Sequence, residues 1–149
     1  MNPKRLIGVD VDGVVVDTIN LYKEASKHLD DPLDFWRSED LYDNLQPMEG
    51  AVEKLEQLSK YFGIVFISRL KGQHHKSKYY FLERYFPFMT EFMGTHGKWV
   101  MNNSVEAMID DLPENLVRFD SHKRVLFGQG EYKDWNTFDV SKFCKEYLK

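Results

Sequence analysis

Two aspartates, Asp10 and Asp12, end an apolar run near the start of the chain and are followed by Gly13. Side chains two residues apart on an extended chain point the same way, so both carboxylates can face one reacting group. Gly13 lets the backbone turn close beneath them. The alternative is an ordinary strand end with an Asp-Gly turn, because both residue types are common in turns. The polar residues that follow later in the chain favour the chemical interpretation.

Later apolar runs also end in polar side chains. One run ends at Ser68, a second ends at Asp110 and Asp111, and Lys98 follows a glycine between them. Ligands of open parallel sheets bind at the carboxyl ends of the strands. We therefore expect these side chains and the first two acids to converge on one crevice.

This ordered set resembles the signature of the haloacid dehalogenase (HAD) superfamily, which is a DxD motif, a Ser or Thr, a Lys and a closing acidic pair. The matching residues are Asp10, Asp12, Ser68, Lys98, Asp110 and Asp111. The resemblance implies an α/β fold of the HAD-like (Rossmann-like) type, with three α/β/α layers, a mainly parallel sheet and a small helical cap insertion. We expect a single HAD-like domain over residues 1–149.

The resemblance also implies a role for each residue. Asp10 would be the nucleophile that forms an aspartyl-phosphate, and Asp12 would protonate the leaving oxygen and later activate water. Ser68 and the Arg69 backbone amide would bind phosphate oxygens, and Lys98 would neutralise charge. Negative neighbours are expected to raise the pKa of Asp12. An acid at this position favours a phosphatase or phosphotransferase over a dehalogenase.

A cation is expected beside these acids, because carboxylates next to a phosphate dianion repel one another. Mg²⁺ takes oxygen ligands and is usually held by one or two carboxylates plus substrate phosphate. By the family pattern, Asp10 and Asp110 supply side-chain oxygens and Asp12 supplies its backbone carbonyl. Asp111 would be a direct or water-mediated ligand, or a support for Lys98.

Residues 18–47 lie where HAD proteins carry cap insertions, between the first strand and the first core helix. The segment begins as a plausible helix and continues without a clear strand. Structureless loops of this length are uncommon in compact domains, so we interpret the segment as a reduced cap. Its aromatic residues Phe35, Trp36 and Tyr42 could stack on a base, but packing against the core is favoured.

Strands and helices that alternate along the chain must position these residues, a pattern typical of an α/β domain with a parallel sheet. Strands are expected over residues 6–11, 64–68, 88–93, 107–110 and 124–127. Helices are expected over 19–28, 50–62, 73–86 and 140–148, with a short one beginning at Pro113. Asp17 is expected to cap the first helix.

Helix 73–86 is expected to pack Tyr79, Tyr80, Leu82 and Phe86. The basic stretch 71–78 reads as a solvated helix start that could also steer an anionic substrate. Adjacent helical residues do not share a face, so His74 and His75 are not expected to hold a metal together.

Composition limits the possible classes of protein. The chain has 149 residues, of which 42% are apolar, enough for a sizeable core. Its net charge of −4 gives no general attraction to nucleic acid or acidic membranes, so a stable nucleic-acid complex is not expected. Cys144 is the only cysteine, which fits a reducing cytoplasm. No stretch approaches the ~20 apolar residues needed to cross a bilayer. A soluble cytoplasmic protein is expected.

Within the superfamily, the chain resembles the 5′(3′)-deoxyribonucleotidase-like branch over residues 10–17, 108–111 and 124–127, the last followed by Trp135. This implies a Mg²⁺-dependent phosphomonoester hydrolase acting on nucleotides. Two departures are a shorter cap and a loop at 128–132 that lacks the expected proline. An open crevice would also admit a larger substrate, such as a phosphorylated nucleic-acid end. A non-catalytic HAD domain that binds a phosphorylated ligand is the other alternative.

Overall fold

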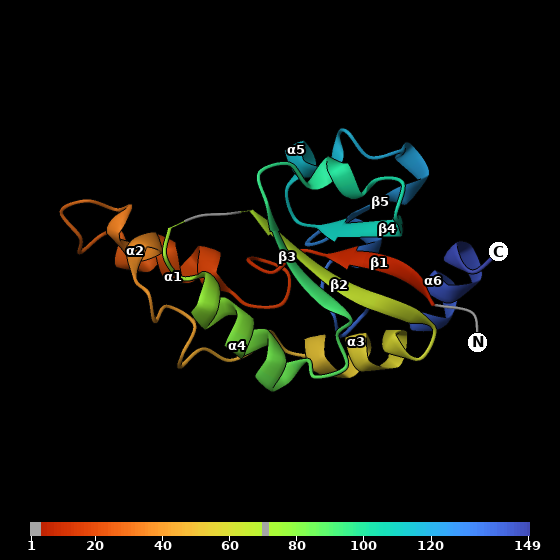
Figure 1. Cartoon of the computed structure of the whole chain (residues 1–149), viewed down its shortest axis with the longest axis horizontal. Coiled ribbons are helices and arrows are strands. Elements are labelled where there is room, and N and C mark those ends of the chain that lie inside the picture. Colours follow the sequence, from red (N-terminus) through yellow and green to blue (C-terminus); the bar gives the residue numbers. More distant parts are fainter. Residues whose placement is uncertain (1–3, 70–71) are drawn as a thin grey trace.

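A computed structural model describes residues 4–69 and 72–149 (Figure 1). Five strands form one sheet with the order β3-β2-β1-β4-β5, and every pairing in it is parallel. The strands are β1 (Arg5–Val9), β2 (Phe62–Arg69), β3 (Glu91–Thr95), β4 (Val105–Asp110) and β5 (Arg124–Leu126). The expected α/β class with a parallel sheet is confirmed. The chain proceeds outward from β1 through β2 to β3 and then crosses to β4, so the strand order reverses beside β1.

Helices cover both faces of the sheet (Figure 1). On one face α3, α4 and α6 enclose the larger core, and on the other α5 and two short 3₁₀ turns cover a smaller one. The helices are α1 (Thr18–Ala25), α2 (Asp34–Arg37), α3 (Ala51–Ser59), α4 (His75–Tyr85), α5 (Pro113–Leu116) and α6 (Val140–Tyr147), with 3₁₀ turns η1 (Lys98–Met101), η2 (Ser121–Lys123) and η3 (Gly130–Tyr132). The result is a three-layer α/β/α arrangement.

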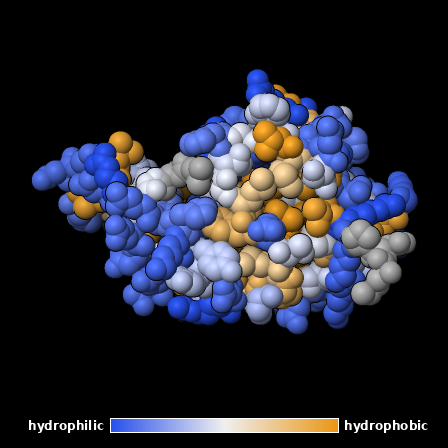
Figure 2. Space-filling view, viewed as in Figure 1, coloured by the Kyte–Doolittle hydropathy of each residue, from blue (hydrophilic) through white to orange (hydrophobic). Residues whose placement is uncertain are grey.

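Burial on both faces explains why the strands read as continuous apolar runs. β2 is buried at seven consecutive positions and becomes exposed only at Arg69. Figure 2 shows hydrophobic residues gathered over the strands, whereas the projecting segment that holds α1 and α2 is mainly hydrophilic. Polar groups are therefore accommodated at the strand ends.

The turn after β1 is fixed by close contacts. Gly13 has φ +81°, and a Cβ there would lie 2.2 Å from the Asp111 Oδ2 atom, so the turn requires glycine. The indole N–H of Trp135 donates a 2.6 Å hydrogen bond to the Val14 carbonyl. The carboxyl-terminal part of the chain thus holds the turn that carries Asp12.

The inward face of α4 differs from the expectation. Tyr79 and Tyr80 are 40% and 50% exposed, while Phe81, Leu82 and Lys78 are buried. Residues three and four apart share a helix face, so burying Phe81 and Leu82 also turns Lys78 inward. The predicted packing of both tyrosines is wrong.

The solvated helix start is also wrong at three of its positions, because His74, Ser77 and Lys78 are buried. Lys71, another member of that stretch, lies outside the described residues. Lys76 in the same stretch is exposed as expected.

Two further details concern element ends. β3 begins three residues later than expected, because the chain turns after α4 and the Met89 N–H donates to the Phe86 carbonyl. The cap of α1 is confirmed, since the Asp17 carboxylate accepts a hydrogen bond from the Asn20 N–H at 3.3 Å.

Candidate active site

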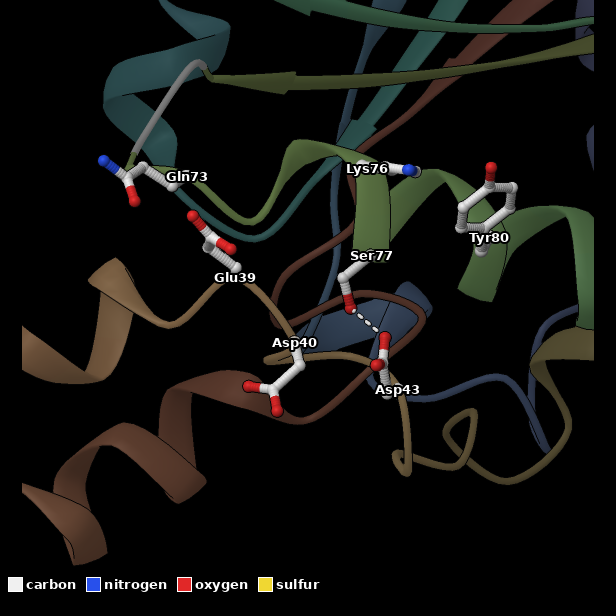
Figure 3. A pocket seen from close by; sticks show the side chains of 7 residues that line it. All are labelled: Glu39, Asp40, Asp43, Gln73, Lys76, Ser77 and Tyr80. Atoms are coloured by element: carbon white, nitrogen blue, oxygen red, sulfur yellow. Dashed lines mark hydrogen bonds between the residues drawn. The ribbon is translucent and has the colours of Figure 1, made fainter.

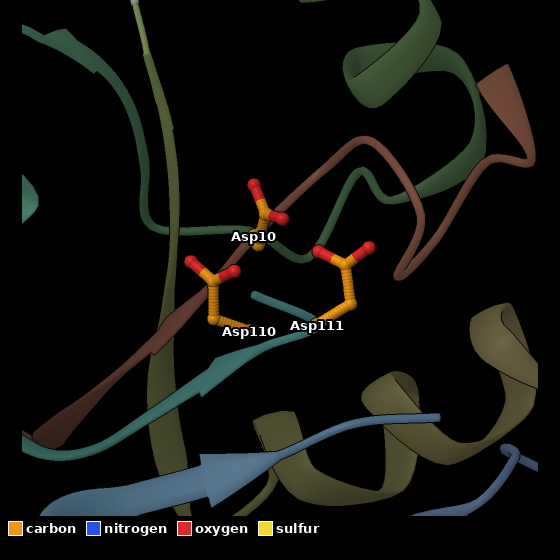
Figure 4. A group of neighbouring side chains, drawn as sticks. All are labelled: Asp10, Asp110 and Asp111. Carbon is orange, nitrogen blue, oxygen red and sulfur yellow. The ribbon is translucent and has the colours of Figure 1, made fainter. Parts of the chain in front are cut away.

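Three aspartates meet at the carboxyl edge of the sheet (Figure 4). Asp10 directly follows β1, Asp110 ends the neighbouring β4, and Asp111 comes next. Asp10 is only 5% exposed and Asp110 is fully buried. This is the point where the strand order reverses, which is where open α/β sheets bind ligands.

Lys98 bridges two of these acids. Its Nζ donates hydrogen bonds to the Asp10 Oδ1 at 2.7 Å and to the Asp110 Oδ2 at 2.8 Å. Burial lowers the pKa of Lys98, but the charges of the two carboxylates outweigh this and raise the pKa overall. The lysine therefore stays charged. The other Asp110 oxygen accepts from the Leu112 N–H at 3.0 Å and from the Asn115 amide at 3.3 Å, which fixes the carboxylate.

One lysine does not balance the negative charge of the cluster. Burial and the neighbouring charges of Asp110 and Asp12 raise the pKa of Asp10 well above its usual range, although Lys98 opposes this. Burial and the charge of Asp110 likewise raise the pKa of Asp111. Both shifts indicate that the acids lack sufficient positive partners.

The cluster fits a hard divalent cation. One carboxylate oxygen from each of Asp10, Asp110 and Asp111 lies within 4.8 Å of the others. The Asp111 Oδ1 is buried, and no donor in the described part of the chain reaches it. A set of carboxylate oxygens that includes one buried oxygen without a donor suits Mg²⁺. The closeness of these acids to one another also helps to explain the raised pKa values of Asp10 and Asp111.

Asp12 belongs to a second network beside the first. Its Oδ1 accepts hydrogen bonds from the Thr18 and Tyr42 hydroxyls, each at 2.5 Å, and its Oδ2 accepts from the Lys78 Nζ at 2.9 Å. Lys78 also donates to the Ser68 Oγ at 2.6 Å. Asp12, Thr18, Ser68 and Lys78 are all buried, and so is Tyr42. The predicted Ser68 and Asp12 are thus joined by a lysine that the sequence motifs did not include.

The predicted direction of the Asp12 pKa is wrong. Burial alone would raise it, but the charge of Lys78 and the hydrogen bonds from Thr18, Tyr42 and Lys78 together lower it. Burial and the adjacent Asp12 charge raise the pKa of Tyr42, so its hydroxyl remains a donor. Asp12 is therefore ionised at neutral pH in this arrangement.

Sequence reasoning missed Lys78, Tyr42 and Thr18. A signal existed for Lys78, which precedes Phe81 and Leu82 by three and four residues and so lies on the apolar face of its helix. For Tyr42 and Thr18 no local pattern could indicate the contact with Asp12. Their positions depend on how residues 18–47 fold back over the sheet edge.

Replacing Lys78 by methionine is expected to lower phosphatase turnover by about 10²-fold, the scale on which positioned proton-transfer groups act. The change removes the charge that keeps Asp12 ionised and the donor that holds Ser68. The acidic limb of the kcat–pH profile should move to higher pH, because the pKa of Asp12 rises. Lys76→Met changes an exposed lysine two residues earlier on α4 and serves as the control. A profile in K78M that matches the control would contradict this role.

A small cavity opens above the acids. Its volume is about 60 Å³, and its lining residues are Asp10, Asp12, Ile19, Ser68, Arg69, Lys98, Asp111, Leu112 and Asn115. Pockets that enclose whole drug-sized ligands measure roughly 300–1,000 Å³. This cavity suits a phosphate group, and the rest of a substrate must lie outside it.

A larger hollow of about 520 Å³ lies between α4 and the loop after α2 (Figure 3). Its lining includes Glu39, Asp40 and Asp43 but none of the predicted site residues. The Ser77 hydroxyl donates to Asp43 at 2.7 Å, which ties the loop to the helix. Three carboxylates in a lining that holds one lysine, Lys76, would repel a phosphate, so this hollow suits that group less well than the small cavity does.

The aromatic residues of segment 18–47 contact one another and the core. Phe35 and Trp36 have ring centroids 4.9 Å apart, and both pack on Tyr22 at 5.6 Å. Tyr42 packs on His74 at 5.4 Å. The favoured packing interpretation agrees with these contacts.

Comparison with known proteins shows the family of this chain. Residues 26–142 match the family described as 5′ nucleotidase, deoxy (pyrimidine), cytosolic type C protein (NT5C). The match includes Ser68, Lys98 and Asp110 and begins after Asp10 and Asp12. No protein of curated function is a significant match.

Two solved structures share the fold. A haloacid dehalogenase-like hydrolase from Burkholderia xenovorans LB400 has 15% identity and a TM-score of 0.58, with 95% of this chain and 88% of that one covered. A haloacid dehalogenase-like family hydrolase from Xanthomonas campestris has 10% identity and a TM-score of 0.64, with 99% and 98% covered. Within the described ranges, no helix has the length and apolar character to cross a membrane.

Proposed function

The chain belongs to the 5′ nucleotidase family NT5C and is a HAD-type, nucleotidase-like phosphatase, and on this premise we propose that it hydrolyses nucleotide phosphomonoesters through Asp10 with Mg²⁺. The observation that carries the proposal is the meeting of three buried or half-buried aspartates with Lys98 at the mouth of a phosphate-sized cavity. Such a site can present a nucleophile and a cation to one phosphate.

In the proposed reaction, an oxygen of the Asp10 carboxylate attacks phosphorus, and the bond from phosphorus to the leaving oxygen breaks. The leaving oxygen takes up a proton as the aspartyl-phosphate forms. Water then attacks the phosphorus of this intermediate, which releases inorganic phosphate and restores Asp10. Ser68 and the Arg69 backbone amide would donate to the phosphate oxygens, while Lys98 offsets their charge.

Asp12 has two tasks in this scheme. Because its pKa is lowered, the ionised carboxylate is suited to take the proton of the hydrolytic water. For the first step, we assign the donated proton to the Lys78 ammonium, which lies 2.9 Å from the Asp12 Oδ2 and can pass the proton through that carboxylate. The proton taken from the hydrolytic water in the second step restores the pair. Tyr42 and Thr18 would keep the carboxylate turned toward this lysine.

The proposed ligands of Mg²⁺ are the Asp10, Asp110 and Asp111 side chains and the backbone carbonyl of Asp12. Asp111 contributes the buried oxygen that has no donor among the described residues. A bound divalent ion would supply charge neutralisation for the acids and for the phosphate. Residues 18–47 are proposed to act as a reduced cap, because Thr18 and Tyr42 reach the site from this segment.

Turnover of a generic aryl phosphate and a panel of 5′- and 3′-mononucleotides tests the proposal. We expect turnover with Mg²⁺, loss of it in EDTA, and preference within the nucleotide panel. Equal turnover in EDTA would contradict the metal requirement. Binding of phosphorylated ligands without any turnover would instead favour the non-catalytic alternative. A cytosolic location is part of the proposal, in agreement with the family description.

Without a divalent ion, stability is expected to fall as pH rises above about 4. Folding raises the pKa values of Asp10 and Asp111. Their contribution to the free energy of unfolding is therefore complete below the unfolded pKa of about 3.9 and is lost as pH rises through their folded pKa values. The lowered pKa of Asp12 acts in the opposite sense, and its contribution is lost only below about pH 3.9.

Urea unfolding across this pH range, in EDTA and with Mg²⁺, measures the effect. Mg²⁺ should remove most of the fall because it replaces the missing positive charge. Asp111→Asn should flatten the EDTA series. An identical slope with and without Mg²⁺ would show that the ion does not bind these acids.

A further inference from the structure

A second groove lies beside the phosphate cavity. Its volume is about 330 Å³, and it runs between η1 and α5. Arg69, Lys98 and Asn115 line both spaces. A group attached to a phosphate in the small cavity would therefore reach this groove by passing these three side chains.

An exposed indole stands in the groove. Trp99 is 46% exposed, and the Arg118 guanidinium lies over it, 4.9 Å from the ring centroid. A Cβ at Gly97 would lie 2.7 Å from the Trp99 Nε1, so the ring rests on a position that only glycine leaves open. The pair forms a fixed, flat surface of the kind on which nucleic-acid bases stack.

The groove is locally positive in a chain whose net charge is −4. Arg69 and Arg118 bring positive charge to its lining, and Glu114 is the acid there. Lys98 also lines the groove, but its charge is shared by Asp10 and Asp110. A nucleoside monophosphate would use its one phosphate beside Asp10. The arginines would then face no phosphate, with Glu114 the acid beside them, whereas a second phosphate on the substrate would meet them.

Segment 18–47, on the other side of the site, contributes little to the phosphate cavity. Ile19 is the one residue of segment 18–47 that lines the phosphate cavity. Phe35 and Trp36 are already engaged with Tyr22. Space, aromatic surface and positive charge coincide instead on the η1–α5 side.

We propose that the η1–α5 groove binds the leaving group of a nucleotide that carries a second phosphate, with its base on the Trp99–Arg118 surface and the second phosphate near Arg69 and Arg118. The inference rests on the proposed function, because it assumes that the phosphate beside Asp10 is the one that is hydrolysed. Such a ligand could be a small nucleoside bisphosphate or the phosphorylated end of an oligonucleotide, which share this chemistry.

The test compares kcat/KM for four classes of substrate: a nucleoside 5′-monophosphate, its 3′,5′-bisphosphate, a short 5′-phosphorylated oligonucleotide, and glycerol phosphate. Wild type should prefer a substrate with a second phosphate by about tenfold or more. Arg118→Gln should lower that preference by about tenfold, the usual worth of a charge-assisted contact. Trp99→Ala should lower kcat/KM for nucleotides relative to glycerol phosphate, which has no ring to stack. A higher kcat/KM for the bisphosphate or for the oligonucleotide identifies which of the two ligands the groove binds.

Tyr61→Ala and Arg84→Gln, at exposed positions outside the groove, are the matched controls and should keep the wild-type ratios. Binding of the bisphosphate to the Asp10→Asn protein is measured by calorimetry, with and without Trp99→Ala. The Asp10→Asn protein lacks the nucleophile, so the measurement tests the groove independently of hydrolysis. Loss of binding in the double variant supports the groove even where no substrate is turned over. Ratios and affinities that do not respond to Trp99 and Arg118 would overturn it.

Discussion

Asp10→Asn is expected to reduce phosphatase turnover by about 10⁴-fold or more, the scale on which removal of a covalent nucleophile acts. The amide has nearly the shape of the carboxylate, but it is a poor nucleophile toward phosphorus. The Lys98 Nζ donates to the Asp10 Oδ1 at 2.7 Å in the wild type, and it can still donate to the amide oxygen of the variant. The fold should therefore persist. Steady-state turnover of an aryl phosphate with Mg²⁺ gives the measurement, and circular dichroism verifies the fold.

The intermediate supplies an independent readout. Rapid acid quench of wild type during turnover should leave a phosphorylated peptide that contains Asp10, and the variant should yield none. Asp17→Asn is the matched control, because it makes the same chemical change at the exposed cap of α1, where asparagine also caps well. Phosphate found on another residue, or turnover in D10N within tenfold of wild type, would assign the nucleophile elsewhere.

The two networks of the site differ in how far the sequence predicted them. Asp10, Ser68 and Asp110 end buried strands, so their convergence follows from a local pattern and from the rule for parallel sheets. Lys98 was predicted from the HAD resemblance, and its contacts with Asp10 and Asp110 agree with that prediction. Their chemical roles remain proposals.

The Asp12 network could not be read in the same way. Lys78 lies 66 residues from Asp12 and Tyr42 lies 30 residues away, in a segment with weak periodicity. The predicted rise in the pKa of Asp12 assumed that its nearest charged neighbours are other acids. One buried lysine from α4 reverses it, and only the packing of Phe81 and Leu82 shows that this lysine faces inward.

Segment 18–47 shows the same limit for the fold. Its helices are short, and contacts distant in sequence hold the end of the segment, such as the Tyr42 N–H donating to the Ser77 Oγ at 2.9 Å. Stretches of this kind carry little local preference for one structure. Element type was predictable for the strands because burial on both faces forces apolar runs. It was less so where a helix end or loop depends on a distant partner.

Lys98→Met is expected to lower stability in EDTA by about 3–5 kcal/mol, the usual cost of removing one partner from a buried ion pair. The lysine is 4% exposed and serves two buried carboxylates, Asp10 and Asp110, which would be left facing each other. Methionine has a similar length and packs well, so the loss would report charge rather than a cavity. Urea unfolding at neutral pH measures the change.

Mg²⁺ should restore part of this stability, because it supplies positive charge to the same acids, but it should not restore turnover. The transferring phosphate would still lack the Lys98 ammonium, and kcat should remain about 10²–10³-fold below wild type. Lys142→Met removes an exposed ion pair with Glu131 and should leave stability nearly unchanged. If K98M unfolds at the same urea concentration as K142M in EDTA, the bridged acids do not depend on this lysine. Recovery of kcat by Mg²⁺ alone would remove Lys98 from the chemistry and leave it a purely structural counter-ion.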